Sequence, residues 1–164
     1  MNPDLASLAQ SAADLLKAGN QTVAVAESST AGLISACLLA VPGASAYFKG
    51  GSVVYTLEAR KELLRIRRED VAGMEPLTEA MVLAFARRAR EQLDAVWGVA
   101  ELGVAGPTGA RYGHPPGISV IGIAGPDERS LLLETGDNNR ERNMWAFTEA
   151  ALNLLSDALR ARQG

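Results

Sequence analysis

Short apolar runs rich in β-branched residues alternate along this chain with longer segments in which apolar residues recur at helical spacing. This alternation favours an α/β domain, in which helices cover both faces of a sheet. Neither a repeat nor a linker-like stretch interrupts it, so we expect one domain over residues 1–164. The predicted strands are residues 22–26, 52–55, 96–104, 118–124 and 130–134, and the predicted helices are residues 5–17, 30–40, 57–66, 78–93 and 139–160.

The composition excludes several classes of protein. Cys37 is the sole cysteine, so a disulfide-stabilised secreted scaffold is excluded, and a sole histidine, His114, cannot supply a multi-histidine zinc site. The chain carries 16 basic and 19 acidic side chains, and its net charge of −3 offers no general attraction to nucleic acid or to an anionic membrane. We therefore expect no metal, no nucleic acid and no membrane partner.

Targeting signals are not evident in the sequence. The opening MNPDLASLAQ contains an acid and no basic segment, which is unlike a signal peptide. The longest apolar stretch, residues 31–48, is interrupted by serine, proline and glycine and is unlike a membrane span. We expect a cytoplasmic protein.

A strand, a turn and a helix are predicted in succession at VAVAESSTAG, residues 23–32. Ser28, Ser29 and Thr30 place hydroxyls at the strand end, where they can act as nucleophiles or meet an anion at the helix N-terminus. Thr30 is also a suitable N-cap, and capping is a common use of serine and threonine there. Both interpretations remain open from these residues alone.

Two further segments are rich in glycine. GASAYFKGG, residues 43–51, leads into a strand that ends at Tyr55, and GVAGPTG, residues 103–109, follows another strand. Glycine permits close approach of the backbone to a ligand, but it also serves in plain turns. A glycine-rich loop after a strand can hold phosphate or carboxylate. Neither segment has the spacing of a P-loop or of a dinucleotide fingerprint.

The helix predicted over residues 57–66 contains two basic residues whose position on it is informative. Helical spacing places Arg60 on its apolar side and Lys61 at the border of that side. An inward cation needs a partner such as a carboxylate or a bound anion, unless its stem packs while its head reaches water. The basic cluster of residues 60–68 is interspersed with acids and lacks aromatic residues, which favours a solvated face over a nucleic-acid site.

In this order, the segments VAVAESSTAGLISACLLAVPGASAYFKGGSVVYTLEARKELL and GVAGPTGARYGHPPG resemble the CinA C-terminal domain family over nearly the whole chain. The resemblance implies a single-domain three-layer α/β/α sandwich with a mixed sheet. It also implies a nicotinamide-nucleotide amidohydrolase, which converts nicotinamide mononucleotide to nicotinate mononucleotide and ammonia without a metal or cofactor. Its expected partners are a small nucleotide substrate and, as a possibility, further copies of the same chain.

The resemblance also implies roles for individual residues. The nucleophile of the family falls on Ser28, its second serine on Ser45 and its tyrosine on Tyr55, while Arg60 stands where the family has a lysine. The neighbouring Lys61 is the alternative base. Backbone N–H groups of residues 30–32 are candidates for binding an oxyanion, and glycines or arginines are candidates for binding a phosphate. The candidate substrate-binding residues are Thr30, Gly32, Gly51, Gly106, Gly109, Arg140 and Arg142.

The departures from the family pattern leave two alternatives to this amidohydrolase. Arginine stays protonated and is a poor base, so the chain is alternatively a catalytically degenerate member that binds a nucleotide-like ligand or another protein. A third interpretation is hydrolysis of a different amide, with Arg60 holding a substrate anion. Ser29, Ala31 and Leu102 also replace the family's usual cysteine, glycine and small hydroxyl residue, and they cluster near the expected site.

Overall fold

The computed structural model describes residues 3–163 and contains one five-stranded sheet in the order β2-β1-β3-β4-β5. The helices are α1 (Leu5–Ala18), α2 (Leu33–Ala40), α3 (Leu57–Leu63), α4 (Glu79–Gln92) and α5 (Arg140–Ala161). The strands are β1 (Val23–Glu27), β2 (Phe48–Val53), β3 (Trp97–Val104), β4 (Ile118–Ala124) and β5 (Arg129–Glu134).

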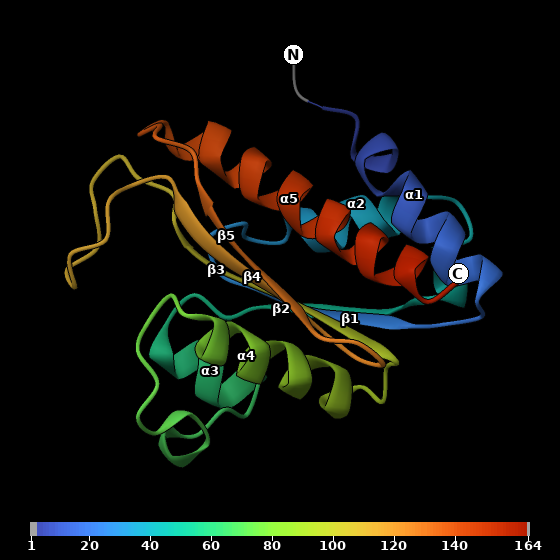
Figure 1. The fold of residues 1–164 in the computed structure, drawn as a ribbon, viewed down its shortest axis with the longest axis horizontal. Coiled ribbons are helices and arrows are strands. Elements are labelled where there is room, and N and C mark those ends of the chain that lie inside the picture. The colour runs from blue at the N-terminus through green and yellow to red at the C-terminus, as the bar shows by residue number, and fades with distance from the viewer. Residues whose placement is uncertain (1–2, 164) are drawn as a thin grey trace.

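The sheet is mixed and covered on both faces. β1 pairs in parallel with β2 and β3, whereas β4 runs antiparallel to both β3 and β5. Helices α1, α2 and α5 lie on one face, and α3 and α4 lie on the other (Figure 1). The expected three-layer α/β/α architecture is confirmed.

Alternating residues of the central strands supply two separate cores. Val25, Trp97 and Val99 face α1, α2 and α5, whereas Ala26 and Ala100 face α4. Side chains of a strand alternate between the two faces of its sheet, so one apolar strand supplies both cores. Trp97 and Cys37 are fully buried in the first of these cores.

The strand β2 begins earlier than the sequence suggested. It covers Phe48–Val53 rather than residues 52–55, and it includes the Gly50-Gly51 pair. A Cβ at Gly51 would lie 2.2 Å from Ser35 Oγ of α2, so the helix packs against this strand closely enough to require glycine. Tyr55 consequently follows the strand instead of ending it.

The helix α3 is shorter than the predicted 57–66. It ends at Leu63, and Arg65 has a left-handed backbone with φ of 56°. A residue in this conformation cannot continue a right-handed helix. The chain reverses there, and Ile66 N donates a hydrogen bond to Arg60 O over 3.1 Å.

The last helix, α5, is amphipathic and spans 22 residues. Phe147, Ala151 and Leu155 face the core, while Glu141 and Arg160 are exposed. Within residues 3–163, no helix combines the length and the apolar character that crossing a membrane requires.

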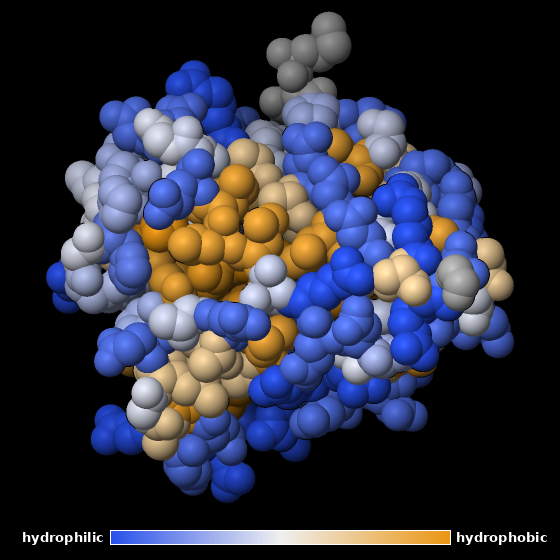
Figure 2. Space-filling view, in the orientation of Figure 1, coloured by the Kyte–Doolittle hydropathy of each residue, from blue (hydrophilic) through white to orange (hydrophobic). Residues whose placement is uncertain are grey.

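The strand β5 lies at the edge of the sheet, and its outer side is open. Leu131 and Leu132 are 37% and 56% exposed. Figure 2 shows hydrophobic surface gathered on this face, where Figure 1 places β5 between the two helical layers.

Candidate functional site

The carboxyl ends of the three parallel strands meet at one edge of the sheet. β1 leads into β2 through α2 on one face, and β2 leads into β3 through α3 and α4 on the other. Such a reversal creates a crevice at the carboxyl ends of the strands, where α/β proteins bind their ligands. Ser28 follows β1, Tyr55 lies shortly after β2 and Ala105 follows β3. The topology therefore assembles the predicted segments at one edge.

Ser28 occupies the first position after β1, with 5% of its surface exposed. Its hydroxyl makes no hydrogen bond to the residues that the structure describes. No fully buried side-chain oxygen or nitrogen within residues 3–163 lacks a partner, so the Ser28 oxygen must reach the accessible surface. A small, solvent-accessible and unpartnered hydroxyl is available for nucleophilic attack.

Two buried carboxylates lie beneath the turn that contains Ser28. Glu27 and Glu101 are register partners on β1 and β3, and both are 0% exposed. Oε2 of Glu101 accepts hydrogen bonds from Ser28 N over 3.1 Å and from Thr30 N over 3.0 Å. Oε1 of Glu101 accepts a hydrogen bond from the Ser29 hydroxyl. Burial raises the pKa of the Glu101 carboxyl, although these hydrogen bonds oppose the rise.

The start of α2 differs from the sequence prediction because Glu27 caps it. Thr30 is not the N-cap: the helix begins at Leu33, after Gly32 with φ of 99°. Glu27 accepts hydrogen bonds from Gly32 N over 3.2 Å, Ile34 N over 2.9 Å and Ser35 N over 2.9 Å. A carboxylate at a helix N-terminus satisfies the free N–H groups and the helix dipole. This end of the helix is already occupied by an anion from the chain itself.

The expected oxyanion donors at residues 30–32 are likewise occupied. Thr30 N donates to Glu101 over 3.0 Å, Ala31 N to Ser28 O over 3.2 Å, and Gly32 N to Glu27 over 3.2 Å. The Thr30 hydroxyl lies 2.7 Å from Glu27 Oε1 and 2.9 Å from Glu101 Oε2. Thr30 and Gly32 therefore hold the turn together rather than offer free groups to a substrate.

Tyr55, Gly106 and Arg140 are brought together by the structure. The Arg140 guanidinium donates a hydrogen bond to Gly106 O and a second one, over 3.4 Å, to the Tyr55 hydroxyl. Tyr55 is 55% exposed, and Arg140 is the first residue of α5. An exposed cation beside a phenol and a glycine-rich loop suits an anionic group such as phosphate.

Arg142, the alternative arginine, has a different partner. Its Nε and Nη2 donate to the two oxygens of Asp137 over 2.7 Å and 3.0 Å. This contact lowers the pKa of the Asp137 carboxyl to about 2. Of the two arginines expected near the last helix, Arg140 is the one that contacts Tyr55.

Arg60 packs inward without meeting a carboxylate. Its Nε donates to Val54 O over 3.3 Å, and its guanidinium lies 5.2 Å from the centre of the Phe85 ring. Burial lowers the pKa of the guanidinium. The partner that the sequence left open is thus an aromatic face and a backbone carbonyl.

Lys61 is exposed on α3 and makes no hydrogen bond to Ser28. It borders a surface depression of about 390 Å³. The other residues around this depression are Glu62, Arg65, Arg67 and Arg88. None of them is a predicted site residue.

Three further candidates occupy separate positions. Ser45 is exposed in the short 3₁₀ turn Ala44–Ala46, and Gly51 packs against α2 as described above. A Cβ at Gly109 would lie 2.5 Å from His114 O, so this glycine allows the loop to close on itself. His114 is half-buried, and its ring meets that of Tyr112 edge-on at 5.3 Å.

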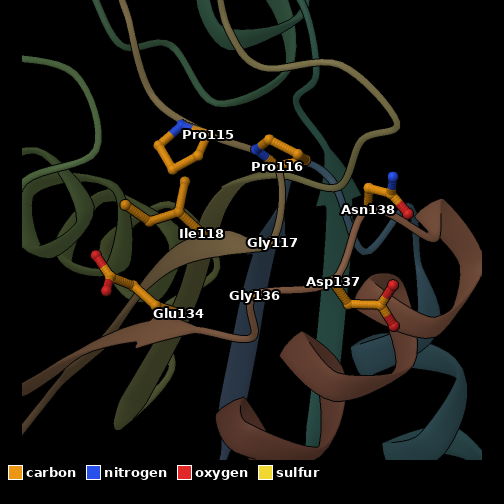
Figure 3. Close-up of a pocket in the computed structure, with 8 residues that line it drawn as sticks. All are labelled: Pro115, Pro116, Gly117, Ile118, Glu134, Gly136, Asp137 and Asn138. Carbon is orange, nitrogen blue, oxygen red and sulfur yellow. The ribbon is translucent and has the colours of Figure 1, made fainter.

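The larger surface cavity, of about 460 Å³, lies beside the candidate site rather than within it. Figure 3 shows the Glu134 and Asp137 side chains pointing in different directions, and Pro115, Pro116 and Ile118 forming an apolar wall. Polar groups that converge on a ligand are therefore lacking among the residues lining it. No cluster of three or more His, Cys, Asp or Glu side chains suited to a metal occurs within residues 3–163.

Sequence reasoning did not single out Glu27 or Glu101. A signal for Glu101 was present, because it is the acidic residue inside an otherwise apolar strand, Trp97–Val104. A charge in such a strand needs buried partners, and the Ser28–Thr30 turn provides them. A Cβ at Gly103 would lie 2.6 Å from Ser29 Oγ and 2.8 Å from Glu101 Oε1, so this glycine leaves room for their contact.

Comparison with known proteins agrees with this arrangement. The family model described as the CinA C-terminal domain matches residues 5–159. The chain belongs to the CinA C-terminal domain family. Its similarity to solved CinA-superfamily structures extends over the whole fold. A Klebsiella pneumoniae protein of this superfamily superposes with a TM-score of 0.88 at 24% identity, covering 97% of this chain and 99% of that one.

Other CinA-family proteins are more similar in sequence. The competence/damage inducible protein CihA from Agrobacterium tumefaciens has a TM-score of 0.85 and 27% identity, with 98% of each chain covered. A CinA-like protein of Thermosynechococcus vestitus is 36% identical over 152 residues, which are 91% of this chain and 36% of that protein. Another, from Prochlorococcus marinus, is 41% identical over 120 residues, 73% of this chain and 28% of that protein. The chain thus spans about a third of the length of these curated relatives.

Proposed function

We propose that this CinA-family chain is an amidohydrolase that converts nicotinamide mononucleotide to nicotinate mononucleotide and ammonia in the cytoplasm. The observation that carries this proposal is the Ser28 hydroxyl, which is unpartnered within residues 3–163 and lies at the sheet edge where the strand order reverses. Serine attack on a carboxamide needs no metal.

In the proposed reaction, Ser28 Oγ bonds to the carboxamide carbon and its proton passes to the amide nitrogen, which leaves as ammonia. Water then hydrolyses the ester on Ser28 and releases the carboxylate product. Tyr55 is proposed to carry the proton, because neither Arg60 nor Lys61 makes a hydrogen bond to Ser28 and the phenol follows the neighbouring strand. Arg140, which donates to Tyr55 over 3.4 Å, is proposed to bind the substrate phosphate.

The second candidate function is that of a nucleotide-binding or interaction module without catalysis. Arg60 favours it, because the residue at the family's lysine position is an arginine whose guanidinium lies on the Phe85 ring. A role for Arg60 in holding the anion of a different amide substrate has less support, because the guanidinium already has two partners.

The test is to incubate the purified protein with nicotinamide mononucleotide and to measure ammonia and nicotinate mononucleotide. Release of both, abolished by Ser28→Ala, is the expected result. An absence of turnover together with thermal stabilisation by the nucleotide would favour the binding module. In that case, turnover by the Arg60→Lys variant would identify the arginine as the reason why the wild-type protein is inactive.

A further inference from the structure

Glu101 satisfies the N–H groups on both sides of Ser29 while it is itself completely buried. Its Oε2 accepts from Ser28 N at 3.1 Å and from Thr30 N at 3.0 Å. Its Oε1 accepts from the Ser29 hydroxyl and, over 3.4 Å, from Ser119. No lysine, arginine or histidine within residues 3–163 forms an ion pair with it. The buried charge is therefore compensated by donors of this turn and of Ser119.

The remaining N–H groups of the turn are also accounted for, except one. Ala31 N donates to Ser28 O, and Gly32 N donates to Glu27 Oε1. Ser29 N makes no hydrogen bond within the described part of the chain, although only 6% of this residue is exposed. Unpaired N–H groups are rare in buried positions, so such a donor is available to water or a ligand.

The free donor directly follows the free hydroxyl. In hydrolases with a serine on a strand-to-helix turn, the N–H of the next residue is one of the groups that stabilise the oxyanion. The Ser28–Ser29 pair has this order, directly after β1 and before α2.

We propose that the Ser29 N–H is the oxyanion donor of this site and that Glu101 is the positioning residue that keeps it available. This assignment rests on the proposed nucleophile Ser28. When Ser28 Oγ bonds to the carboxamide carbon, the C=O π electrons move to the oxygen, which accepts the Ser29 N–H. The electrons return as the C–N bond breaks and the nitrogen, which has received the Ser28 proton, leaves as ammonia. Glu101 touches neither substrate nor reacting atoms.

Variants at Glu101 separate hydrogen-bond acceptance from mere side-chain volume. Glu101→Gln retains an oxygen that accepts from Ser28 N and Thr30 N, whereas Glu101→Met has similar length and no such acceptor. The matched control is Ser119→Ala, which removes the 3.4 Å contact to Oε1 and a 3.3 Å contact to Leu102 O but leaves the acceptor for Ser28 N and Thr30 N in place. Ser28→Ala identifies the reacting residue.

The readout is the rate at which a fluorophosphonate labels Ser28, since this reaction needs an activated serine and an oxyanion donor but no amide substrate. We expect Glu101→Gln to label within about 10-fold of wild type, Glu101→Met about 100-fold more slowly, and the control at an unchanged rate. With nicotinamide mononucleotide, kcat should fall in the same order at nearly constant KM. Equal rates for folded Gln and Met variants, or no labelling of wild-type Ser28, would overturn the assignment.

A measurement on the wild-type protein keeps the test decisive if Glu101→Met does not fold. Amide hydrogen exchange should be at least about 10-fold faster at Ser29 than at Ser28 and Thr30, because Glu101 holds the latter two. Equal protection of the three amides contradicts the proposal. Labelling in the expected order without ammonia release supports the role of Glu101 and contradicts only the proposed substrate.

Discussion

Glu27 and Glu101 stand side by side on the parallel strands β1 and β3, and the Thr30 hydroxyl lies within hydrogen-bond distance of both carboxyl groups, at 2.7 Å and 2.9 Å. One hydroxyl has one proton to donate, so it cannot fully satisfy two carboxylates at once. The two acids divide the remaining donors between them: Glu27 holds the start of α2, and Glu101 holds the turn at Ser28. This pair connects the stability of the fold to the geometry of the candidate site.

Removing the Glu27 carboxylate should destabilise the protein. Glu27→Ala leaves the N–H groups of Gly32, Ile34 and Ser35 without their acceptor, so we expect the free energy of unfolding to fall by about 3 kcal/mol. Urea unfolding at neutral pH measures this, with the exposed Glu91→Ala as a control that changes little. A loss equal to that of the control would show that Glu27 does not support the helix.

The buried Glu101 should make stability fall as the pH rises. Burial raises the pKa of its carboxyl above the ordinary 4.5, so the folded state binds the proton more tightly than the unfolded state. Its contribution is present below pH 4.5 and is lost as the pH rises through the folded pKa, at up to about 1.4 kcal/mol per pH unit.

Urea unfolding of wild type and Glu101→Gln from pH 4.5 to about 8 tests this sign. Wild type should lose stability relative to the variant over this range. The exposed Glu149→Gln serves as the control and should run parallel to wild type. Parallel curves for Glu101→Gln as well would refute a raised pKa.

Arg140 and Arg142 should differ in their effect on substrate binding. Arg140→Ala removes the proposed phosphate ligand beside Tyr55, and we expect KM for nicotinamide mononucleotide to rise about 10- to 100-fold. Arg142→Ala, whose guanidinium is bound to Asp137, should leave KM nearly unchanged. Nicotinamide riboside, which lacks the phosphate, should be handled equally by wild type and Arg140→Ala. An equal loss with both substrates would mean that Arg140 does not bind the phosphate.

The two cations of α3 should prove to be structural or solvent-exposed. Arg60→Ala should lower the free energy of unfolding by about 1 kcal/mol, because it removes the contact with the Phe85 ring. Lys61→Ala should leave ammonia release within about twofold of wild type, because Lys61 is exposed and makes no hydrogen bond to Ser28. Steady-state assays and urea unfolding measure these effects. A large loss of turnover in Lys61→Ala would restore lysine as the base.

Cys37 should be inert in the folded protein. Burial raises the pKa of its thiol to about 11, so very little thiolate exists near pH 8. We expect a disulfide reagent such as DTNB to label the native protein at least about 100-fold more slowly than the urea-unfolded protein. Rapid stoichiometric labelling of the native state would place Cys37 outside the core.

Much of the fold was predictable because the local pattern and the tertiary environment agree. The strand predicted over residues 118–124 has the same bounds in the structure, and the edge strand differs by one residue. Where the local pattern and the tertiary environment disagree, contacts with a neighbouring strand or helix set the bounds of the element. β2 starts at Phe48 because it pairs with β1 and packs beneath Ser35, and α2 starts at Leu33 because Glu27 takes its first N–H groups.

The sequence by itself determined the order of helices and strands, the two-sided burial of the central strands, and the presence of hydroxyls and glycines at strand ends. These properties follow from residue spacing and propensity, which act over a few residues. Only the tertiary structure decided which groups remain free at the site. Glu101 holds the Ser28 turn across 73 positions, and Arg140 reaches Tyr55 across 85. Such contacts depend on strand order and register, because a hydrogen bond requires atoms within about 3.2 Å whatever their separation along the chain.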